Sequence, residues 1–427
     1  MKHHVILGTG PAGVIAAETL RKQAPHDRIT LVGDEPEPPY SRMAIPYLLI
    51  GNIDEPGTYL RKSPDHFARQ RIDIVHAKAT GVDIKTRQVT LDSEDSLPFD
   101  TLLIATGSHP VRPPIPGMDL PGVHPCWTLE NARAIAQLAQ PGAKVLQMGA
   151  GFIGCIIMEA LKQRGVQLTV VEMGDRMVPR MMGPAAGGMI REWCESKGVK
   201  VFTGAKVQGI EPGEGQALQV RLSNGETLTA DLVISATGVR PAIGFLEHSG
   251  ITCLLGVLTD EHMQTNVPGI YAAGDCAEAF DKVSGKAIVS AIQPNAADQA
   301  YVAAMNMAGK PAVLKGVTQI NVLDTLGLIS TSFGNWEGVP GGEKVELSDA
   351  VNHKVLSLQF DGDVMVGCNS VGWTDHVGVM RGLVEGKVKL GDWKRQLMED
   401  PTQLMKAYLA TAQAQGHWSG AADARRR

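Results

Sequence analysis

Short apolar runs alternate with amphipathic stretches along most of the chain. The runs Val5–Leu7, Ile29–Val32 and Leu102–Ser108 are short and end at turn residues, which predicts buried strands. The stretch Ala12–Gln23 has the length and composition of a helix, and Pro25 ends it. Strands that alternate with helices in this way predict an α/β fold.

The same order of patterns occurs a second time further along the chain. Val145–Met148 and Leu168–Val171 predict two more buried strands. The strand predicted at Asp231–Ser235 runs into Ala-Thr-Gly, as the strand at Leu102–Ile104 does, so the chain contains an internal duplication. The proline-rich crossing Pro110–Pro116 lies between the two copies and is the best candidate for a domain boundary.

Each copy carries a glycine-rich fingerprint between its first strand and its helix. The two sequences are Gly8-Thr9-Gly10-Pro11-Ala12-Gly13 and Gly149-Ala150-Gly151-Phe152-Ile153-Gly154. In such a turn the first glycine permits the bend, the second admits a pyrophosphate, and the third lets helix and strand pack closely. The helix N-terminus offers unpaired N–H groups to the phosphates. One match could be an ordinary turn between strand and helix, but two predict two bound dinucleotides and electron transfer between them.

An acidic residue follows the second strand of each copy. Asp34 and Glu35 occupy this place in the first copy, and Glu172 occupies it in the second. A carboxylate here accepts hydrogen bonds from ribose hydroxyls and repels a 2′-phosphate, so Glu172 predicts a preference for NADH over NADPH. Arg176 could accommodate a phosphate, but Asp175 beside it argues against that role. The alternative for Glu172 is a solvated strand end.

The last third of the chain has a different pattern. Ile270–Ala273 predicts a strand that ends in Gly274-Asp275, and a helix is expected at Asn295–Met307. From about Gly316 the pattern predicts a separate α+β domain. Within it we expect a β-hairpin, with strands Val355–Phe360 and Val364–Val366 around the turn Asp361-Gly362, and a helical tail over Asp392–Gln413.

Composition and charge exclude several classes of function. The 427 residues are too many for one core, which predicts two or three domains. A net charge of −5, with no long basic run before Arg425–Arg427, gives no support for nucleic-acid binding. No apolar run has the length of a membrane span and no signal peptide is recognisable, so a cytoplasmic protein without a membrane partner is expected. The six cysteines are scattered, and neither a disulfide framework nor a metal site is expected.

The order of motifs resembles that of a known superfamily. Fingerprint, Ala-Thr-Gly, fingerprint, Ala-Thr-Gly and Gly-Asp follow one another as in the two-dinucleotide-binding flavoproteins of the pyridine nucleotide-disulfide oxidoreductase superfamily. The resemblance implies an α/β protein with two Rossmann-like domains, for FAD and for NAD, and a C-terminal α+β interface domain. The implied boundaries are 1–112 and 245–315 for a discontinuous FAD domain, 113–244 for the NAD domain and 316–427 for the C-terminal domain.

The resemblance also implies the residues that hold the cofactors. Asp34 would bind the FAD ribose, and Asp275 would bind the ribityl or phosphate part. The expected cofactor-binding residues are Gly8, Gly10, Pro11, Ala12, Gly13, Asp34, Glu35, Arg42, Ala79, Ala105, Thr106, Gly107, Gly149, Gly151, Phe152, Ile153, Gly154, Glu172, Gly238, Gly274 and Asp275.

Two local features narrow the subfamily. Met43 stands where the single-cysteine members carry their redox thiol, and the Cys-x-x-x-x-Cys of the disulfide reductases does not occur. A thioether cannot form a thiolate or a sulfenic acid. The segment Pro39-Tyr40-Ser41-Arg42 resembles the Pro-Tyr-x-Arg stretch of ferredoxin- and rubredoxin-reductase-type flavoproteins and of the flavin-NAD portion of assimilatory nitrite reductases, in which the arginine contacts FAD. Those relatives often continue with Pro-Leu-Ser-Lys, and this chain has no lysine there.

These resemblances imply an FAD-dependent NADH oxidoreductase that passes electrons through FAD to a small redox protein of the ferredoxin or rubredoxin type. Hydride transfer needs no acid or base, so no catalytic side chain is expected. Two alternatives remain open: an NADH oxidase or diaphorase that uses oxygen or a small acceptor, and a flavin-bearing signalling protein. A small electron-carrier protein is the expected partner, and the chain is expected to be a monomer or a homodimer.

Overall fold

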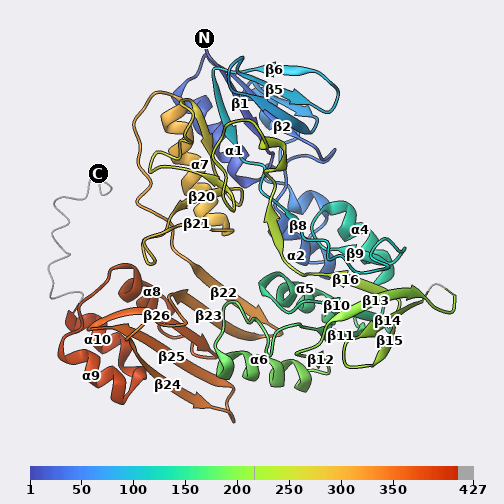
Figure 1. The fold of residues 1–427 in the computed structure, drawn as a ribbon, viewed down its shortest axis with the longest axis vertical. Coiled ribbons are helices and arrows are strands. Elements are labelled where there is room, and N and C mark those ends of the chain that lie inside the picture. The colour runs from blue at the N-terminus through green and yellow to red at the C-terminus, as the bar shows by residue number, and fades with distance from the viewer. Residues whose placement is uncertain (216, 412–427) are drawn as a thin grey trace. The chain divides into compact units, whose positions relative to one another are not determined.

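The computed structural model describes residues 1–215 and 217–411, and within them the chain forms two compact units (Figure 1). The first unit comprises Met1–Val111, Trp127–Ala132 and Val239–Val317. The second unit comprises Arg112–Cys126, Arg133–Gly238 and the described chain from Thr318 onward. The division into three domains with the boundaries given above stays a prediction.

A five-stranded parallel sheet forms the centre of the first unit. Its strand order is β19-β7-β1-β2-β3, and every neighbouring pair runs parallel. Val5, Ile6 and Leu31 in these strands are fully buried, as expected for a parallel sheet covered on both faces. The strands are β1 (His3–Leu7), β2 (Arg28–Gly33), β3 (Ile72–His76), β7 (Thr101–Ile104) and β19 (Ile270–Ala272).

Two long helices of the first unit pack against each other beside this sheet, α1 (Pro11–Gln23) and α7 (Gln293–Met307). Both match the helices predicted from the sequence within two residues. The shorter elements of this unit are β4 (Ala79–Asp83), β5 (Gln88–Leu91), β6 (Ser96–Pro98), β8 (Ser108–Pro110), β17 (Val239–Pro241), β18 (Val257–Leu258), β20 (Ala277–Phe280), β21 (Ala287–Val289), α2 (Ile45–Ile50), α3 (His66–Arg69) and the 3₁₀ turns η1 (Arg42–Ala44), η2 (Glu55–Thr58) and η3 (Gly244–Leu246).

The second unit contains a parallel sheet with the same internal order. Its strands run β12-β11-β10-β16-β9, so the fingerprint strand again lies between the strand that carries the acid and the strand that ends in Ala-Thr-Gly. This correspondence confirms the internal duplication. The elements are β9 (Val123–Pro125), β10 (Lys144–Met148), β11 (Gln167–Val171), β12 (Lys200–Phe202), β16 (Leu232–Ser235), α5 (Phe152–Gln163) and α6 (Pro184–Ser196), with α4 (Leu129–Leu138) belonging partly to each unit.

Two antiparallel sheets complete the second unit. One has three strands in the order β13-β14-β15, and the other has five in the order β22-β23-β26-β25-β24. The predicted hairpin is β25 and β26, which pair antiparallel in the larger sheet. The strands are β13 (Val207–Pro212), β14 (Leu218–Leu222), β15 (Thr227–Ala230), β22 (Ile320–Thr325), β23 (Leu328–Gly334), β24 (Glu343–Asp349), β25 (Lys354–Asp361) and β26 (Val364–Val371), and helix α8 (Val377–Glu385) follows them.

The prediction of one continuous helical tail was wrong. The chain forms α9 (Asp392–Glu399), the 3₁₀ turn η4 (Pro401–Gln403) and α10 (Leu404–Thr411) instead. Asp400 has φ −142° and ψ 95°, because the residue before a proline is pushed out of the helical region. Its carboxylate accepts the N–H of Thr402 and so caps the next turn. The end of the predicted tail, from residue 412, lies outside the described residues.

Two kinds of feature are absent from the described residues. No helix in that part of the chain is long and apolar enough to cross a bilayer. No group of three or more His, Cys, Asp or Glu side chains there could hold a metal ion.

Candidate functional site

The first glycine of each fingerprint packs against the Ala-Thr-Gly turn of its own unit. A Cβ atom on Gly8 would lie 2.0 Å from the carbonyl oxygen of Ala105, and one on Gly149 would lie 2.4 Å from that of Ala236. Both glycines also have positive φ, 117° and 96°. Any side chain would therefore clash with backbone and strain the turn. The two motifs that the sequence presents separately are thus one structural feature, a fingerprint turn that crosses an Ala-Thr-Gly turn.

The third glycine of each fingerprint permits the helix to approach the strand. A Cβ on Gly13 would lie 1.9 Å from the carbonyl oxygen of Gly8, and one on Gly154 would lie 2.6 Å from that of Gly149. In the second unit, the buried Gln147 adds a hydrogen bond from Nε2 to the carbonyl of Gly149 at 2.9 Å. Sequence reasoning missed this glutamine, because a polar residue in an apolar strand carries no motif.

The second glycine of each fingerprint faces open space. A Cβ on Gly10 or on Gly151 would have no described atom within 4 Å. Each of these residues is also the N-cap of its helix, and no side chain of the described residues caps α1 or α5. The first-turn N–H groups therefore remain available for an anion at a helix N-terminus. This combination fits the pyrophosphate of a dinucleotide in both units.

Glu35 in the first unit is held by two side chains. Nη2 of Arg42 lies 2.6 Å from its Oε1, and the Tyr40 hydroxyl donates to its Oε2 at 2.5 Å. Burial raises the pKa of Tyr40, so the phenol stays a donor at physiological pH. Asp34 is exposed immediately after β2. Asp34 is therefore the acid that faces solvent at the expected ribose position.

Arg42 joins Glu35 to Trp127 and acts electrostatically on Asp275. Its Nη1 donates to the carbonyl of Trp127 at 2.7 Å, and its guanidinium lies 5.2 Å from the Trp127 ring centroid. Asp275 is half-buried, and burial raises its pKa, while the Ser108 hydroxyl, which donates to it at 2.9 Å, and the charge of Arg42 oppose this rise. Two of the predicted residues, Arg42 and Asp275, thus act on one another electrostatically.

The Gly-Asp turn packs on the first fingerprint. A Cβ on Gly274 would lie 3.4 Å from the Cβ of Ala12, and the Gly274 N–H donates to the side chain of Gln299 at 2.7 Å. Gln299 is fully buried in α7, and its Nε2 has no partner among the described residues. Sequence reasoning missed Gln299 because it stands 24 residues after the motif it supports, inside an ordinary helical pattern.

The remaining predicted residues surround these turns to different degrees. The Thr106 hydroxyl donates to the carbonyl of Ala242 at 2.8 Å, which ties the first Ala-Thr-Gly turn to the following segment. Gly107 and Gly238 both have positive φ at the ends of their turns. Pro11, Phe152 and Ile153 are half-buried in the first turns of α1 and α5. Ala79 begins β4.

Glu172 in the second unit turns back onto the backbone. Its Oε2 accepts the N–H of Ala150 at 2.7 Å, and its Oε1 accepts the N–H of Gly174 at 2.7 Å. The residue is only 8% exposed. The solvated strand end considered above is therefore wrong, since the carboxylate joins the fingerprint to the loop that follows β11.

The Arg176 guanidinium is hydrogen-bonded within its own loop. Its Nε donates to the carbonyl of Met182 at 2.8 Å, its Nη2 to that of Pro179 at 3.3 Å, and its Nη1 to Asp175 at 2.7 Å. These contacts engage every nitrogen of the guanidinium. The arginine therefore stabilises the loop.

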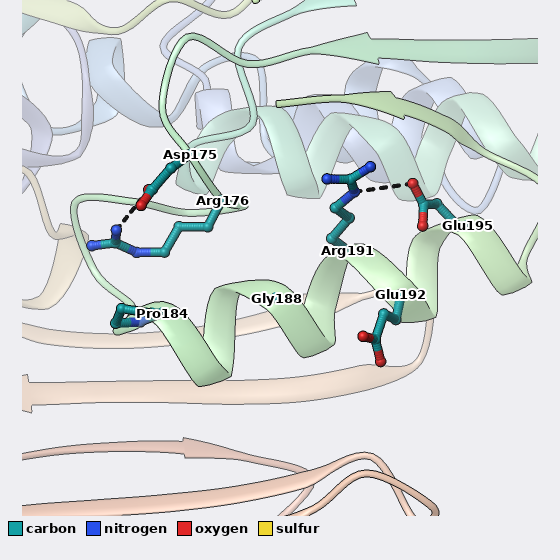
Figure 2. Close-up of a pocket in the computed structure, with 7 residues that line it drawn as sticks. All are labelled: Asp175, Arg176, Pro184, Gly188, Arg191, Glu192 and Glu195. Carbon is teal, nitrogen blue, oxygen red and sulfur yellow. Dashed lines mark hydrogen bonds and ion pairs between the residues drawn. The ribbon is translucent and has the colours of Figure 1, made fainter. Parts of the chain in front are cut away.

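A cavity of about 310 Å³ lies beside this loop, against α6 (Figure 2). Figure 2 shows the Arg191–Glu195 pair and the Asp175–Arg176 pair on its walls. Ligand sites are usually lined mainly by apolar side chains, whereas most of this lining is charged. No fingerprint residue lines it, so the cavity neighbours the candidate NAD site without containing its glycines. The lining residues are Asp175, Arg176, Pro184, Gly188, Arg191, Glu192 and Glu195.

None of the six cysteines has the surroundings of a reactive thiol. Five are buried and Cys253 is half-buried. Burial raises the pKa of Cys276 to about 11 and that of Cys126 and Cys194 to about 12, and it also raises the pKa of the other three. A reactive cysteine needs a lowered pKa and access to solvent. Met43, by contrast, is exposed in η1 and has no thiol.

Comparison with known proteins identifies relatives over most of the chain. The model of the family described as pyridine nucleotide-disulphide oxidoreductase matches residues 2–305. The chain is 32% identical over 401 residues to a protein named NADH oxidase from Methanocaldococcus jannaschii, covering 86% of this chain and 87% of that protein. It is 31% identical over 404 residues to the NADH-dependent phenylglyoxylate dehydrogenase subunit epsilon of Aromatoleum evansii, covering 93% and 95%.

Other relatives carry the name of ferredoxin reductases. The chain is 34% identical over 274 residues to the ferredoxin–NAD(+) reductase component of the biphenyl dioxygenase system of Paraburkholderia xenovorans, covering 64% of this chain and 66% of that one. A solved structure of the covalent putidaredoxin reductase–putidaredoxin complex matches 96% of this chain and 99% of its own with a TM-score of 0.88 at 24% identity. At that identity the structural match shows the fold, and it agrees with the predicted α/β class with Rossmann-like domains.

Proposed function

Because the chain belongs to the pyridine nucleotide-disulphide oxidoreductase family, we propose that it is an NADH-dependent reductase of a small electron-carrier protein. It is an oxidoreductase that uses FAD and NADH, as its family and its reductase relatives do. Flavin, when bound, supplies the conversion between two-electron hydride chemistry and one-electron transfer. A protein with both nucleotides is thus suited to bridge NADH and a one-electron carrier.

The residues of the first unit fit the FAD. The open position at Gly10 and the uncapped start of α1 would hold its pyrophosphate. Asp34 would accept from the ribose hydroxyls, and Asp275 would accept from the ribityl chain. Each carboxylate would place an acceptor where the cofactor has hydroxyl donors.

The residues of the second unit fit NADH. Gly151 and the start of α5 would hold the pyrophosphate, while Glu172 keeps a negative charge where NADPH carries its phosphate. Arg176 does not offset this charge, because its nitrogens are engaged by the loop and by Asp175. We infer that the donor is NADH.

A single observation supports the proposal of an external acceptor: none of the six cysteines has a thiol suited to flavin chemistry. Met43 occupies the position of the redox cysteine, and all six cysteines have raised pKa values. Electrons that reach the flavin have no internal disulfide to reduce. They leave to an external acceptor, and the ferredoxin reductase relatives favour a small iron protein.

A second candidate is an NADH oxidase. The relative with that name aligns over 401 residues, whereas the ferredoxin reductase component aligns over 274. Oxygen would replace the carrier as acceptor, and the residues that bind FAD and NADH would be the same. The cytoplasm, where NADH is abundant, is the proposed location, and a monomer or homodimer remains the proposed assembly.

Steady-state NADH oxidation with different acceptors separates the two candidates. The FAD-loaded protein is assayed with a panel of ferredoxins and rubredoxins, and with oxygen alone as the reference. The proposed function predicts that at least one carrier raises turnover well above the oxygen rate. Turnover with oxygen that equals or exceeds the rate with every carrier would favour the oxidase. A Gly151→Ala variant, which should keep FAD and lose NADH binding, reports the background.

A further inference from the structure

The loop that follows Glu172 connects the second fingerprint to the C-terminal sheet. It runs from Met173 to Gly183, where α6 begins. At its centre Val178 has φ +50° and is only 1% exposed. Valine in the left-handed region is a true outlier, because a β-branched side chain crowds the backbone there. Such strain persists only where surrounding contacts over-determine the conformation.

Backbone contacts hold Val178 at the fingerprint. Its N–H donates to the carbonyl of Ala150 at 2.8 Å, and its carbonyl accepts the N–H groups of Met181 and Met182 at 3.0 Å each. Ala150 also donates its N–H to Glu172. The fingerprint turn, the acid and the loop therefore form one hydrogen-bonded group.

The other end of the loop is held by a residue of β26. Asn369 is 2% exposed, its Nδ2 donates to the carbonyl of Met181 at 2.9 Å, and its Oδ1 accepts the N–H of Gly183 at 2.8 Å. These two residues flank Met182, whose carbonyl accepts from Nε of Arg176. Asn369 thus fixes the backbone on both sides of Met182, whose carbonyl accepts the hydrogen bond from the Arg176 guanidinium.

The stem of Arg176 is confined as well. A Cβ on Gly187 in α6 would lie 2.9 Å from both Cγ and Cδ of Arg176, so the arginine passes over this glycine with no room to spare. The Arg176 side chain is therefore restricted to one conformation as long as the loop keeps its backbone conformation. Released from the carbonyls of Met182 and Pro179, the same guanidinium would offer a cation in the loop that follows Glu172.

We propose that Asn369 is a positioning residue for nucleotide selectivity: it holds the 181–183 backbone so that Arg176 stays committed to the loop and cannot bind a 2′-phosphate. The inference rests on the proposed function, because it takes Glu172 as the ribose acid and NADH as the donor. It assigns to the C-terminal sheet an effect on nucleotide choice that neither the fingerprint nor the acid would reveal.

The test compares NADH with NADPH in the Asn369→Leu variant, which keeps the number and branching of the side-chain heavy atoms and removes both hydrogen bonds. Dissociation constants come from equilibrium titration with NAD⁺ and NADP⁺, and from the saturation of flavin reduction by NADH and NADPH. We expect the NADH-over-NADPH preference in affinity to narrow about tenfold, the scale of one charge-assisted contact. The rate of flavin reduction at saturating NADH should stay within about twofold, because no reacting atom is touched.

Two controls separate this role from a merely structural one. Thr331→Val/Ser370→Ala removes a buried 2.6 Å hydrogen bond that includes the next residue of β26 and leaves the loop untouched. It should lower the melting temperature without changing the nucleotide preference. Asn369→Leu/Arg176→Gln should lose the gain in NADPH affinity, since the proposed effect acts through the guanidinium.

The outcomes distinguish this proposal from the proposed function. A wild-type protein without preference for NADH would overturn the nucleotide assignment, and this inference with it. A selective wild type whose Asn369→Leu variant keeps the same preference would overturn this inference alone. An equal narrowing of the NADH-over-NADPH preference in Asn369→Leu/Arg176→Gln would also overturn it. If Asn369→Leu does not fold, Asn369→Asp keeps the acceptor for Gly183, loses the donor to Met181, and should show the same change to a smaller extent.

Discussion

The two fingerprint units share a strand order, but the acidic residue after the second strand has different hydrogen-bond partners in each. In the first, Glu35 is bound by side chains of the stretch that follows it, Tyr40 and Arg42. In the second, Glu172 is bound by backbone N–H groups of the fingerprint and of its own loop. The first arrangement orders the stretch after β2, which Arg42 also ties to the Trp127 carbonyl, whereas the second ties the end of β11 to the fingerprint turn through backbone groups.

This difference fits the proposed binding of FAD by the first unit and of NADH by the second. A cofactor that stays bound benefits from a segment locked across its site, and Arg42 locks such a segment to Glu35 and Trp127. A nucleotide that enters and leaves in every cycle needs a site whose polar groups are already satisfied when it is empty. The structure therefore predicts slow release of FAD and rapid exchange of NADH.

The largest effect is expected from adding one methyl group at the second fingerprint glycine. Gly10 and Gly151 have φ near −75°, which alanine adopts without strain, and a Cβ would meet no protein atom. The methyl group would instead occupy the approach of the pyrophosphate. Gly10→Ala should fold and be purified without FAD, while Gly151→Ala should keep FAD and bind NADH at least about a hundredfold more weakly.

Flavin absorbance per chain and NADH titration measure these two losses, and the melting temperature shows that the fold is kept. Stoichiometric FAD in purified Gly10→Ala would contradict the assignment of the first fingerprint. Exchange of the two phenotypes would mean that the units are assigned to the wrong nucleotides.

A smaller loss is expected at Arg42. Arg42→Lys keeps the charge but cannot contact Glu35 and the Trp127 carbonyl in the same geometry. Charge-assisted hydrogen bonds of this kind contribute about 1.5–3 kcal/mol, so FAD should bind about 10- to 100-fold more weakly. Arg61→Lys is the matched control, because Arg61 also pairs with a carboxylate, Glu18, in the same unit. Equal FAD affinities of the two variants would show that Arg42 has only a structural role.

A more moderate effect is expected at the acid of the second unit. In Glu172→Gln one of the two N–H groups, from Ala150 or from Gly174, would face an amide NH₂ instead of an oxygen. NADH affinity should fall about tenfold and NADPH affinity by less, since the charge that repels the phosphate is gone. Rapid-mixing measurements of flavin reduction with each nucleotide give both values. An unchanged ratio would place the ribose elsewhere.

The smallest effect is expected on the pH dependence of stability, from a residue pair in the first strand of each unit. His4 in β1 is fully buried, and its ring pairs with Thr101 at 2.6 Å, whereas the corresponding residues of the second unit are Val145 and Leu232. Burial lowers the pKa of His4 below 6.5. Its contribution to stability is therefore fully present above pH 6.5 and is lost as the pH falls through the lowered value.

His4→Val/Thr101→Leu copies the pair of the second unit into the first. Between about pH 8 and pH 5 the temperature of FAD release should fall less in this variant than in the wild type, by about 2–4 °C. Parallel pH profiles would exclude His4 as a source of acid sensitivity.

Much of the fold follows from local sequence. Apolar runs and glycine turns place the strands β1 and β10 and the helix α1 within two residues, because each pattern has one local physical cause. The tail failed as a prediction because helical periodicity continues across Asp400-Pro401, where the proline ends it. The duplication predicts the same strand neighbours for corresponding strands of the two copies. It predicts no neighbours for strands that lie outside the copies.

The local geometry of the candidate site was predictable where a motif fixes it, as at Gly10 and Gly151. It was not predictable where a residue acts through contacts distant in sequence. Gln299 supports Gly274 from within a helix, and Asn369 holds the loop after Glu172 from nearly two hundred residues away. The commitment of Arg176 to the loop carbonyls likewise appears only in three dimensions.

One anaerobic single-turnover measurement tests the central claim, that this chain carries electrons from NADH through FAD to a one-electron carrier. The FAD-loaded protein is reduced with one equivalent of NADH without oxygen and is then mixed with an oxidised ferredoxin or rubredoxin. The account predicts rapid bleaching of the flavin by NADH, followed by its reoxidation with about two carrier molecules reduced per NADH. Flavin that stays reduced with every carrier and is reoxidised only when oxygen is admitted would contradict it.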